Sequence, residues 1–301
     1  MPIAFRHEPR VTYGVVQTLS PLIRRIVANN GGPFTYYGTG TYVIGHGRVA
    51  IVDPGPALTA HVDALLAALA VNDETISHQL ITHTHNDHSP AARLVHERTG
   101  APTYGFGPHG LGQYERGSTV EAGADMAFAP DVVLRDGDTV EGDGWSVGCV
   151  HTPGHCSNHL CYSVGQERTL LTGDHVMGWS TSVISPPDGD MGDYIASLER
   201  LLERDDHTYL PAHGPAVTET GSYVRSLIEH RKERERQILG CVAQGVGRIT
   251  DMIPLMYAGT DKILYPAAAR SVFAHVIHML QRGMLAHDGP TPTLGASYRL
   301  R

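Results

Sequence analysis

The chain has 301 residues, of which 41% are hydrophobic, enough for one large domain with a buried core and a second, small one. Its 23 Lys and Arg against 31 Asp and Glu give a formal charge of −8, which argues against a general nucleic-acid binder, because phosphate affinity rests mainly on basic side chains. Since no apolar run could span a membrane or serve as a secretory signal, we expect a cytoplasmic protein without a membrane partner.

The first hundred residues predict strands that alternate with helices, which is typical of a layered α/β protein. Strands are expected at 42–45, 48–52 and 77–81, and helices at 58–70 and 91–98. The first two strands form a hairpin that delivers Asp53 to a loop, where we expect a turn-forming residue or a partner of a site residue. Ser89 and Pro90 are typical of an N-cap and a first helical position, and Gly100 of a helix end.

The segment THTHNDH, residues 82–88, lies between the third strand and the second helix and carries the densest chemistry of the chain. It places His83, His85 and His88 with the carboxylate of Asp87 within six consecutive positions. Neither packing nor solubility requires this density, so the segment predicts a metal site rather than a merely solvated loop.

Three further strands are predicted at 145–150, 169–172 and 207–210, with a helix at 193–204 before the last of them. Soon after each strand comes a residue that can bind a metal: His155 in TPGH, Asp174 in GD and His213 in PAHG. Loops at strand ends are positioned by a rigid sheet and often carry catalytic groups. We therefore expect these residues to meet the histidine cluster at one edge.

Imidazole and carboxylate ligands suit divalent metal ions, of which zinc is expected here and manganese or iron are alternatives. A carboxylate can bridge two ions about 3.5–4 Å apart, and a water between them becomes hydroxide near neutral pH. The predicted arrangement has a first metal on His83, His85 and His155, a second on Asp87, His88 and His213, and a bridge at Asp174. Asp87 is also the candidate for orienting the hydroxide or accepting its proton, which makes Asp87 and Asp174 the catalytic residues.

At these motifs the chain resembles metallo-β-lactamase-fold hydrolases. THTHNDH, TPGH, GD and PAHG are similar to four motifs of that superfamily in the same order, over about residues 10–218, and Asp53 in IVDPG matches a structural position. The resemblance implies a four-layer αβ/βα sandwich with the metals at one edge. The best-known zinc β-lactamases carry Cys where this chain has Asp174, which argues against antibiotic hydrolysis.

Within the superfamily, the run from Gly173 through residues 193–198 to Pro215 resembles the LACTB2-like branch more than glyoxalase II, whose glutathione-binding elements are not matched by His175-Val176-Met177-Gly178-Trp179. That branch contains thioesterases that release acyl chains from carriers and an endoribonuclease. The expected function is therefore hydrolysis of a thioester or related ester of a small-molecule acyl substrate. A phosphodiesterase acting on single-stranded RNA is the alternative, and a catalytically silent metal-binding protein is the third.

Residues around the predicted ligands have plainer interpretations. His151, His159 and His175 are expected near the site or at the surface, and contact between His175 and substrate is the alternative. Cys156 is expected to be a small buried residue, and the four cysteines show no C-x-x-C spacing. Met177 and Trp179 line either a substrate pocket or the core. Residues 180–192 predict a loop over the site that influences specificity.

From about residue 219 the character of the chain changes, and we predict a separate helical cap domain at 219–301. Helices are expected at 222–239, 249–257 and 267–282, and the segments after the last helix suggest a winged-helix arrangement. The first helix carries EHRKERERQ, in which Glu229, Glu233, Arg231 and Glu235 have i,i+4 spacing. This predicts a solvated, salt-bridged face, with an RNA-contacting surface as the alternative.

Overall fold

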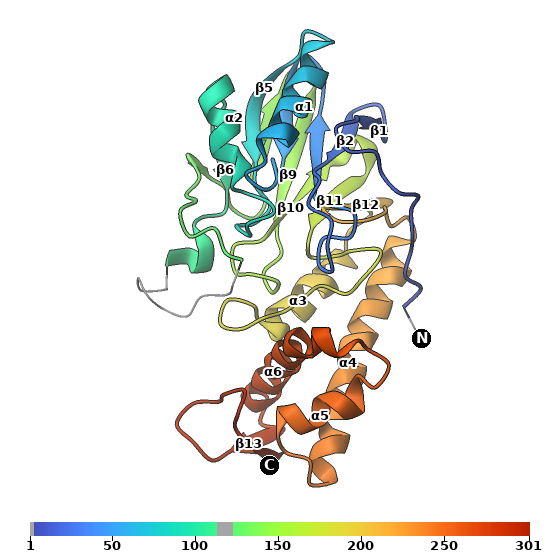
Figure 1. The fold of residues 1–301 in the computed structure, drawn as a ribbon, viewed down its shortest axis with the longest axis vertical. Helices are drawn as coiled ribbons and strands as arrows, with labels where there is room; N and C mark the ends of the chain where they lie inside the picture. The colour runs from blue at the N-terminus through green and yellow to red at the C-terminus, as the bar shows by residue number, and fades with distance from the viewer. Residues whose placement is uncertain (1–2, 113–122) are drawn as a thin grey trace.

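Two β-sheets pack face to face in the computed structural model, which describes residues 3–112 and 123–301 (Figure 1). Within these ranges the first sheet has the order β1 (Gln17–Thr18), β2 (Ile23–Val27), β3 (Gly40–Ile44), β4 (Arg48–Val52), β5 (Thr75–Leu80), β6 (Thr103–Gly105) and β7 (Val132–Val133). The second has the order β12 (Thr208–Pro211), β11 (Thr169–Gly173), β10 (Leu160–Val164), β9 (Trp145–His151) and β8 (Thr139–Gly142). Side chains such as Leu80 and Tyr162 fill the space between the sheets.

Helices cover the outer face of each sheet. The first sheet packs against α1 (Thr59–Ala70) and α2 (Ala91–Thr99) through one apolar cluster that includes Val43, Leu65 and Val95. The second sheet packs against α3 (Met191–Leu201) and α4 (Thr220–Ala243) through another that includes Leu170 and Leu198. The predicted αβ/βα sandwich is therefore confirmed.

The direction of the strands explains why the predicted ligands meet. β9 and β11 are each antiparallel to β10, and β11 is parallel to β12, so β9, β11 and β12 run in one direction and end at the same edge. In the other sheet β5 is parallel to β4 and leads directly into the histidine cluster. The loops that carry the metal-binding residue types therefore lie together at one edge of the sandwich.

The expected strands and helices of this region are present, with ends that differ by a few residues. The predicted N-cap of α2 is wrong, because the Ser89 hydroxyl donates to Asp125 Oδ2 at 2.7 Å and Pro90 occupies the cap position. Gly100 ends the helix with a φ of 71°, as expected for a left-handed cap.

The strands that the sequence did not predict include β2, whose residues Ile23–Val27 read IRRIV. All five are buried, although two are arginines. Arg24 is held by Glu74 at 2.6 Å, and Arg25 by Glu8 at 2.8 Å, so these charges are paired inside the protein. Partners this distant in sequence leave no local pattern.

The C-terminal part forms its own apolar core, which includes Ile249, Val272, Met279 and Tyr298. Its elements are α5 (Ile249–Met256), the short 3₁₀ helix η3 (Lys262–Leu264), α6 (Tyr265–Gln281) and the hairpin of β13 (Leu285–His287) with β14 (Tyr298–Leu300). Helices followed by such a hairpin are the winged-helix arrangement that the sequence suggested. The proposed division at 218/219 stays a prediction, because α4 contributes to the second-sheet core at one end and to this core at the other.

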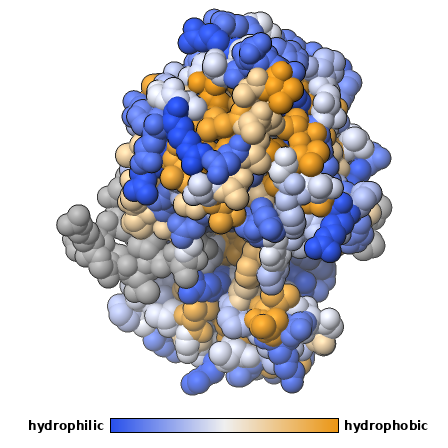
Figure 2. All heavy atoms as spheres, turned by 45° about the horizontal axis from the view of Figure 1, so that its top comes forward, coloured by the Kyte–Doolittle hydropathy of each residue, from blue (hydrophilic) through white to orange (hydrophobic). Residues whose placement is uncertain are grey.

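One stretch of the described residues, Lys262–Gln281, is long and apolar enough to cross a membrane by composition. The core helix of a soluble protein passes the same test, and α6 buries Val272, Val276 and Met279 against its neighbours. Large hydrophobic side chains also reach the surface here, at Leu255 and Ile263, and hydrophobic residues appear over both halves of the face in Figure 2.

Helix α4 is only partly the solvated face that the sequence predicted. On its exposed side, Arg236 pairs with Glu229 and with Glu233. The prediction is wrong for Arg231 and Glu235, which are buried, and Glu235 accepts a hydrogen bond from His278 Nδ1 at 2.8 Å. The helix is thus amphipathic, but its many charged residues, some of them buried, make this hard to recognise in the sequence.

A buried histidine of the sandwich gives a pH prediction. Burial lowers the pKa of His61 to about 4, and its Nε2 lies 2.8 Å from the Thr41 hydroxyl. Because the unfolded chain binds a proton at this residue from about pH 6.5 downward and the folded chain does not, stability should fall as the pH drops from 6.5 towards 4. At pH 5 we expect a loss of roughly 1–2 kcal/mol from this residue. Urea unfolding of wild type and His61→Gln at pH 7 and pH 5 measures it, and equal pH slopes for both proteins would contradict it.

Candidate metal centre

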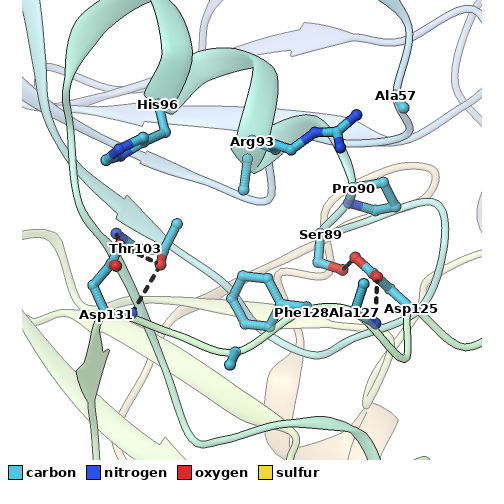
Figure 3. A pocket seen from close by; sticks show the side chains of 12 residues that line it. Ala57, Ser89, Pro90, Arg93, His96, Thr103, Asp125, Ala127, Phe128 and Asp131 are labelled. Carbon is cyan, nitrogen blue, oxygen red and sulfur yellow. Dashed lines mark hydrogen bonds between the residues drawn. The ribbon is translucent and has the colours of Figure 1, made fainter.

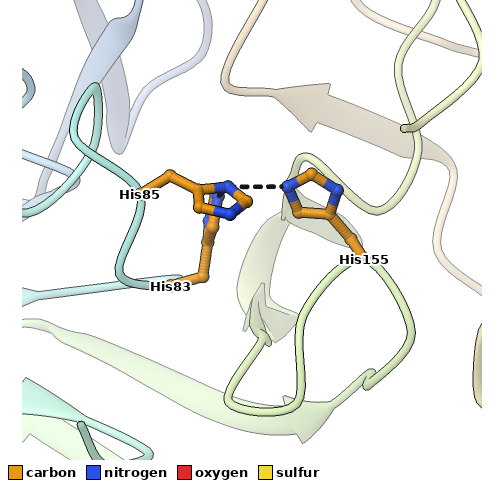
Figure 4. Close-up of side chains that lie close together, drawn as sticks. All are labelled: His83, His85 and His155. Carbon is orange, nitrogen blue, oxygen red and sulfur yellow. Dashed lines mark hydrogen bonds between the residues drawn. The ribbon is translucent and has the colours of Figure 1, made fainter. Parts of the chain in front are cut away.

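Three histidines from two loops form the first half of the site. His83 Nε2 lies 2.9 Å from His85 Nδ1, and His155 Nε2 lies 3.0 Å from the same atom. Figure 4 shows the His85 and His155 rings turned toward one another above His83. The three ligand atoms lie within 4.8 Å of one another, so all of them can reach one cation.

The second half combines imidazoles with carboxylates. His213 Nε2 lies 3.2 Å from Asp87 Oδ2 and 3.3 Å from Asp174 Oδ1. His88 Nε2 lies 3.6 Å from the same Asp87 oxygen and 3.7 Å from the same Asp174 oxygen. All four side chains therefore direct donor atoms to one point.

Asp174 lies between the two groups. Its Oδ1 faces His88 and His213, whereas its Oδ2 lies 3.8 Å from His155 Nε2. A carboxylate with one oxygen directed to each group has the placement that a bridge between two cations needs. The structure thus brings all seven predicted ligands together.

The spacing and burial of these atoms fit a metal better than hydrogen bonds alone. Donors about 2.1 Å from one tetrahedral zinc ion lie roughly 3.4 Å apart, which is close to the separations in the second group. His88 Nε2 and Asp174 Oδ1 are buried and make no hydrogen bond within the described residues. Buried polar atoms without partners are costly, and a bound cation would satisfy both.

The outward nitrogens of the histidines are held by the protein. His88 Nδ1 donates to Asp53 Oδ2 at 2.9 Å, His155 Nδ1 to the Val183 carbonyl at 2.6 Å, and His213 Nδ1 to the Gly38 carbonyl at 3.3 Å. Such bonds fix the ring orientation and direct Nε2 into the site. Asp53, expected as a turn former or a partner of a site residue, is such a partner.

The electrostatics of the cluster favour added positive charge. Burial would raise the pKa of Asp174, but the imidazoles of His213 and His88 outweigh it and hold the pKa well below the usual range. Burial alone would lower the pKa of His213, because it disfavours the charged imidazolium, yet Asp174 and Asp87 raise this pKa to about 10. In the first group, burial and the imidazoles of His88, His85 and His155 lower the pKa of His83 well below 6.5, which keeps it neutral, the form that binds metals.

The backbone of Asp174 is positioned by several contacts. Its N–H donates to His159 Nε2 at 3.2 Å, and its carbonyl accepts from the Ser182 hydroxyl at 2.6 Å. Gly173, with a φ of 48°, makes the turn before it, and a side chain there would come within 2.6 Å of His159 Nε2. His159 is thus the buried neighbour of a site residue that the sequence suggested.

A cavity of about 460 Å³ opens onto the cluster, and Asp87, His155 and Asp174 line it. Its other walls are largely apolar and come from four segments: Phe34, Met177, Val183, Pro266 and Ala267. Arg270 of α6 adds a positive charge to the lining. Val183 and Ser185 of the 180–192 loop line the cavity as expected, whereas the effect of this loop on specificity stays a prediction. The wall residues of α6 and of the 33–38 loop carry no motif from which the sequence could have predicted them.

Most of the other residues that the sequence placed near the site pack within the protein and do not face the cavity. His175 is fully buried beside Tyr194, with ring centroids 4.9 Å apart, and does not line the cavity, so the hypothesis that it contacts substrate is wrong. His151 stacks on Phe106, and Cys156 is fully buried as expected. Met177 lines the cavity, whereas Trp179 packs beside Tyr36 with ring centroids 5.1 Å apart.

A cavity of similar size, about 450 Å³, lies beside α2 (Figure 3). Its polar groups already have partners: the Ser89 hydroxyl donates to Asp125, the Thr103 backbone N–H and hydroxyl both donate to Asp131 Oδ2, Arg93 pairs with Glu97, and His96 Nδ1 lies 3.0 Å from the Ala101 carbonyl. Internal pairing leaves these groups without the convergent, unsatisfied donors of a metal or catalytic site. The chemistry of the described residues is therefore concentrated at the histidine cluster.

Comparison with known proteins shows which families the chain matches. The family model of the metallo-β-lactamase superfamily matches residues 36–213, and that of the β-lactamase-associated winged helix domain matches residues 249–290. An atrochrysone carboxyl ACP thioesterase of Claviceps purpurea is 30% identical over 228 residues, covering 74% of this chain and 66% of the relative. A β-lactamase-like protein 2 homolog of Caenorhabditis elegans is 31% identical over 226 residues, covering 74% and 72%.

The fold agrees with that of a solved structure over nearly its whole length. The crystal structure of a β-lactamase domain protein from Burkholderia ambifaria superposes with a TM-score of 0.79 at 18% identity, covering 96% of this chain and 94% of that one. The superfamily model spans all seven predicted ligands, and the relatives confirm the resemblance to the LACTB2-like branch. The chain therefore belongs to the metallo-β-lactamase superfamily of hydrolases and carries its associated winged-helix domain at the C-terminal end.

Proposed function

We propose that this hydrolase cleaves thioesters or related esters of small acyl groups, using two divalent metal ions. The observation that carries the proposal is the largely apolar cavity that opens onto Asp87 and Asp174. Apolar walls favour an acyl chain, because they gain from removing it from water and offer little to a polar phosphodiester backbone. The thioesterase name of a relative that is 30% identical supports the same class of substrate.

In this proposal His83, His85 and His155 hold the first metal ion, Asp87, His88 and His213 hold the second, and Asp174 bridges them. When bound, the two ions would lower the pKa of water toward neutrality and polarise the acyl carbonyl. The chain itself would position the reactants: the cavity walls hold the acyl group, and Asp87, 28% exposed at its side chain, orients the attacking water and accepts its proton. Addition of water to the carbonyl carbon and loss of the thiolate give a carboxylic acid and a thiol.

Zinc is the proposed metal, because the ligand set of imidazoles and carboxylates in groups of three or four suits it. The same ligands accept manganese or iron, and the set lacks the thiolate that would select a softer ion. Metal analysis of the purified protein decides between them.

Single-stranded RNA is the second candidate substrate, since basic residues of α4 line a cavity beside the one described above. The net charge of −8 and the apolar walls at the metal cluster weigh against RNA.

Parallel assays on acyl thioesters, lactones and single-stranded RNA test the proposed function. Thioester hydrolysis that is lost on chelation is the expected result. Cleavage of RNA alone would overturn the proposal, and inactivity of the metal-loaded protein on every substrate would favour a catalytically silent binder.

Asp53 tests the role of the residues behind the ligands. Asp53→Ala removes the acceptor of His88 Nδ1 and of the Thr82 backbone N–H, so His88 loses its fixed orientation. We expect metal affinity or activity to fall roughly 10- to 100-fold. Metal competition with a chromophoric chelator measures this, with Asp63→Asn, an exposed carboxylate on α1, as the matched control. Unchanged affinity in Asp53→Ala would show that His88 does not need this partner.

A further inference from the structure

Another cavity, of about 330 Å³, lies beside the metal cavity between the sandwich and the C-terminal domain. We call it the interdomain pocket; its walls include residues 180–183, α4 and α6. Phe34, Val183 and Ala267 line both cavities, so the two cavities are neighbours. The interdomain pocket differs in its chemistry, because His230, Arg231 and Arg234 of α4 line it and no acidic residue does.

Arg231 is the most unusual of these residues, because its side chain is buried without a counter-charge. The residue is 2% exposed, and within the described residues no carboxylate lies within ion-pair distance of it. Its Nη2 donates to the Ser182 carbonyl at 2.6 Å, its guanidinium lies 4.9 Å from the centre of the Tyr194 ring, and its Nε is buried with no hydrogen-bond partner. A buried arginine normally has an anionic partner, since an unpaired buried charge is costly.

Arg234 stands one helical turn later and is also without an acidic partner in the described part of the chain. Its Nη1 donates to Gln237 Oε1 at 2.8 Å and to the Met256 carbonyl at 3.1 Å, and its guanidinium lies 4.3 Å from the centre of the Tyr257 ring. These neutral contacts hold the group in place without neutralising it. By contrast, Arg236 on the outer face of the same helix pairs with Glu229 and Glu233.

The chain therefore neutralises the arginine that faces solvent and leaves uncompensated the two that line the pocket. His230 does not supply the missing negative charge, and burial with the neighbouring Arg231 and Arg234 lowers its pKa to about 4, so it is a neutral hydrogen-bonding group. Two guanidinium groups in a partly dry pocket suit a phosphate, whose oxygens accept the parallel hydrogen bonds that arginine offers.

We propose that the interdomain pocket binds the phosphate of the carrier arm of a thioester substrate, such as a pantetheine phosphate, while the acyl group occupies the metal cavity. This inference rests on the proposed thioesterase function. The arm that joins sulfur to phosphate is long, flexible and uncharged, so it suits a path along Phe34, Val183 and Ala267, which line both cavities. A single phosphate suits the pocket better than RNA, which needs a series of basic contacts along a groove.

Calorimetric titration of the full-length, metal-loaded protein with phosphopantetheine and with pantetheine tests the inference. Both probes carry the same thiol, so their difference isolates the phosphate. We expect the phosphorylated probe to bind wild type at least about tenfold more tightly, as suits a charged hydrogen-bonded pair. In Arg234→Gln this ratio should fall below about threefold, and in Arg236→Gln, the matched exposed control, it should stay at the wild-type value. Thermal melts confirm that both variants are folded.

Hydrolysis of the corresponding acyl thioesters separates this inference from the proposed function. The expected result is a preference of wild type for the phosphorylated substrate in kcat/KM, carried mainly by KM and diminished in Arg234→Gln. Equal binding and equal hydrolysis of the two forms would overturn the inference and leave the thioesterase proposal intact. A different outcome is that the protein hydrolyses neither thioester but cleaves single-stranded RNA, and that Arg234→Gln cleaves RNA more slowly than wild type. Both proposals would then be wrong, and the pocket would bind RNA.

Discussion

Replacing Asp174 with alanine is expected to lower kcat for an acyl thioester by roughly a thousandfold or more and to reduce the bound metal from two ions per chain to one or fewer. Asp174 directs Oδ1 toward His213 Nε2 at 3.3 Å and Oδ2 toward His155 Nε2 at 3.8 Å. No other described carboxylate faces both groups. Its loss should therefore disturb both proposed metal positions together.

The Asp174→Ala experiment needs metal analysis and kinetics on the same preparation. Asp63→Asn serves as the control, because this side chain is 59% exposed on α1 and pairs with Arg98 away from the site. The control should keep wild-type metal content and activity. An Asp174→Ala protein with two bound ions and full activity would exclude a bridging role for this carboxylate.

Replacing Asp87 with asparagine is expected to lower kcat about 100- to 10,000-fold while KM changes by less than about threefold. The substitution keeps the size of the side chain and one oxygen ligand but removes the negative charge that accepts a proton. Asp87 lines the cavity, and its Oδ2 lies 3.2 Å from His213 Nε2, so this side chain faces both the cavity and the cluster.

Steady-state kinetics with saturating metal separate the two roles of Asp87. If the activity of Asp87→Asn returns fully at high metal concentration, the residue acts only as a metal ligand, and the prediction that it accepts a proton is wrong. If kcat is unchanged and only KM rises, the residue binds substrate without taking part in the reaction. A low kcat that excess metal does not restore is the result we expect.

The metal-binding cluster could be predicted from the sequence because its information is local. Four of the seven predicted ligands occupy one hexapeptide, and the others follow strands whose apolar pattern is clear. The parallel course of β9, β11 and β12 then brings their ends to one edge. The alternating strands and helices and the helical C-terminal part followed from the periodicity of apolar residues, whereas the sandwich was what the family resemblance implied.

The walls of the site could not be predicted, because they come from segments that are distant in sequence and carry no chemistry of their own. Phe34 lies in a loop before β3, and Pro266 and Arg270 belong to α6, more than two hundred residues later. Substrate specificity is determined by such walls. The apolar residues near the metals and the basic residues of α4 became a pattern only once the fold placed them together.

Charge patterns misled where burial depends on a distant partner. Arg231 and Glu235 looked solvated in a run of charged residues, yet both are buried because α6 and residues 180–183 cover that face of α4. The arginines of β2 were overlooked for the same reason, since Glu74 and Glu8 pair with them from elsewhere. A local helix or strand pattern cannot reveal a salt bridge that tertiary structure creates.

The most direct test of a two-metal thioester hydrolase is titration of the metal-free protein with Zn²⁺ while thioester hydrolysis is recorded. We predict that activity is negligible without metal, rises with added zinc and reaches its maximum at about two equivalents per chain. Full hydrolysis in the presence of excess chelator would contradict the two-metal mechanism. A zinc-loaded protein that leaves every acyl thioester intact would contradict the proposed thioesterase function.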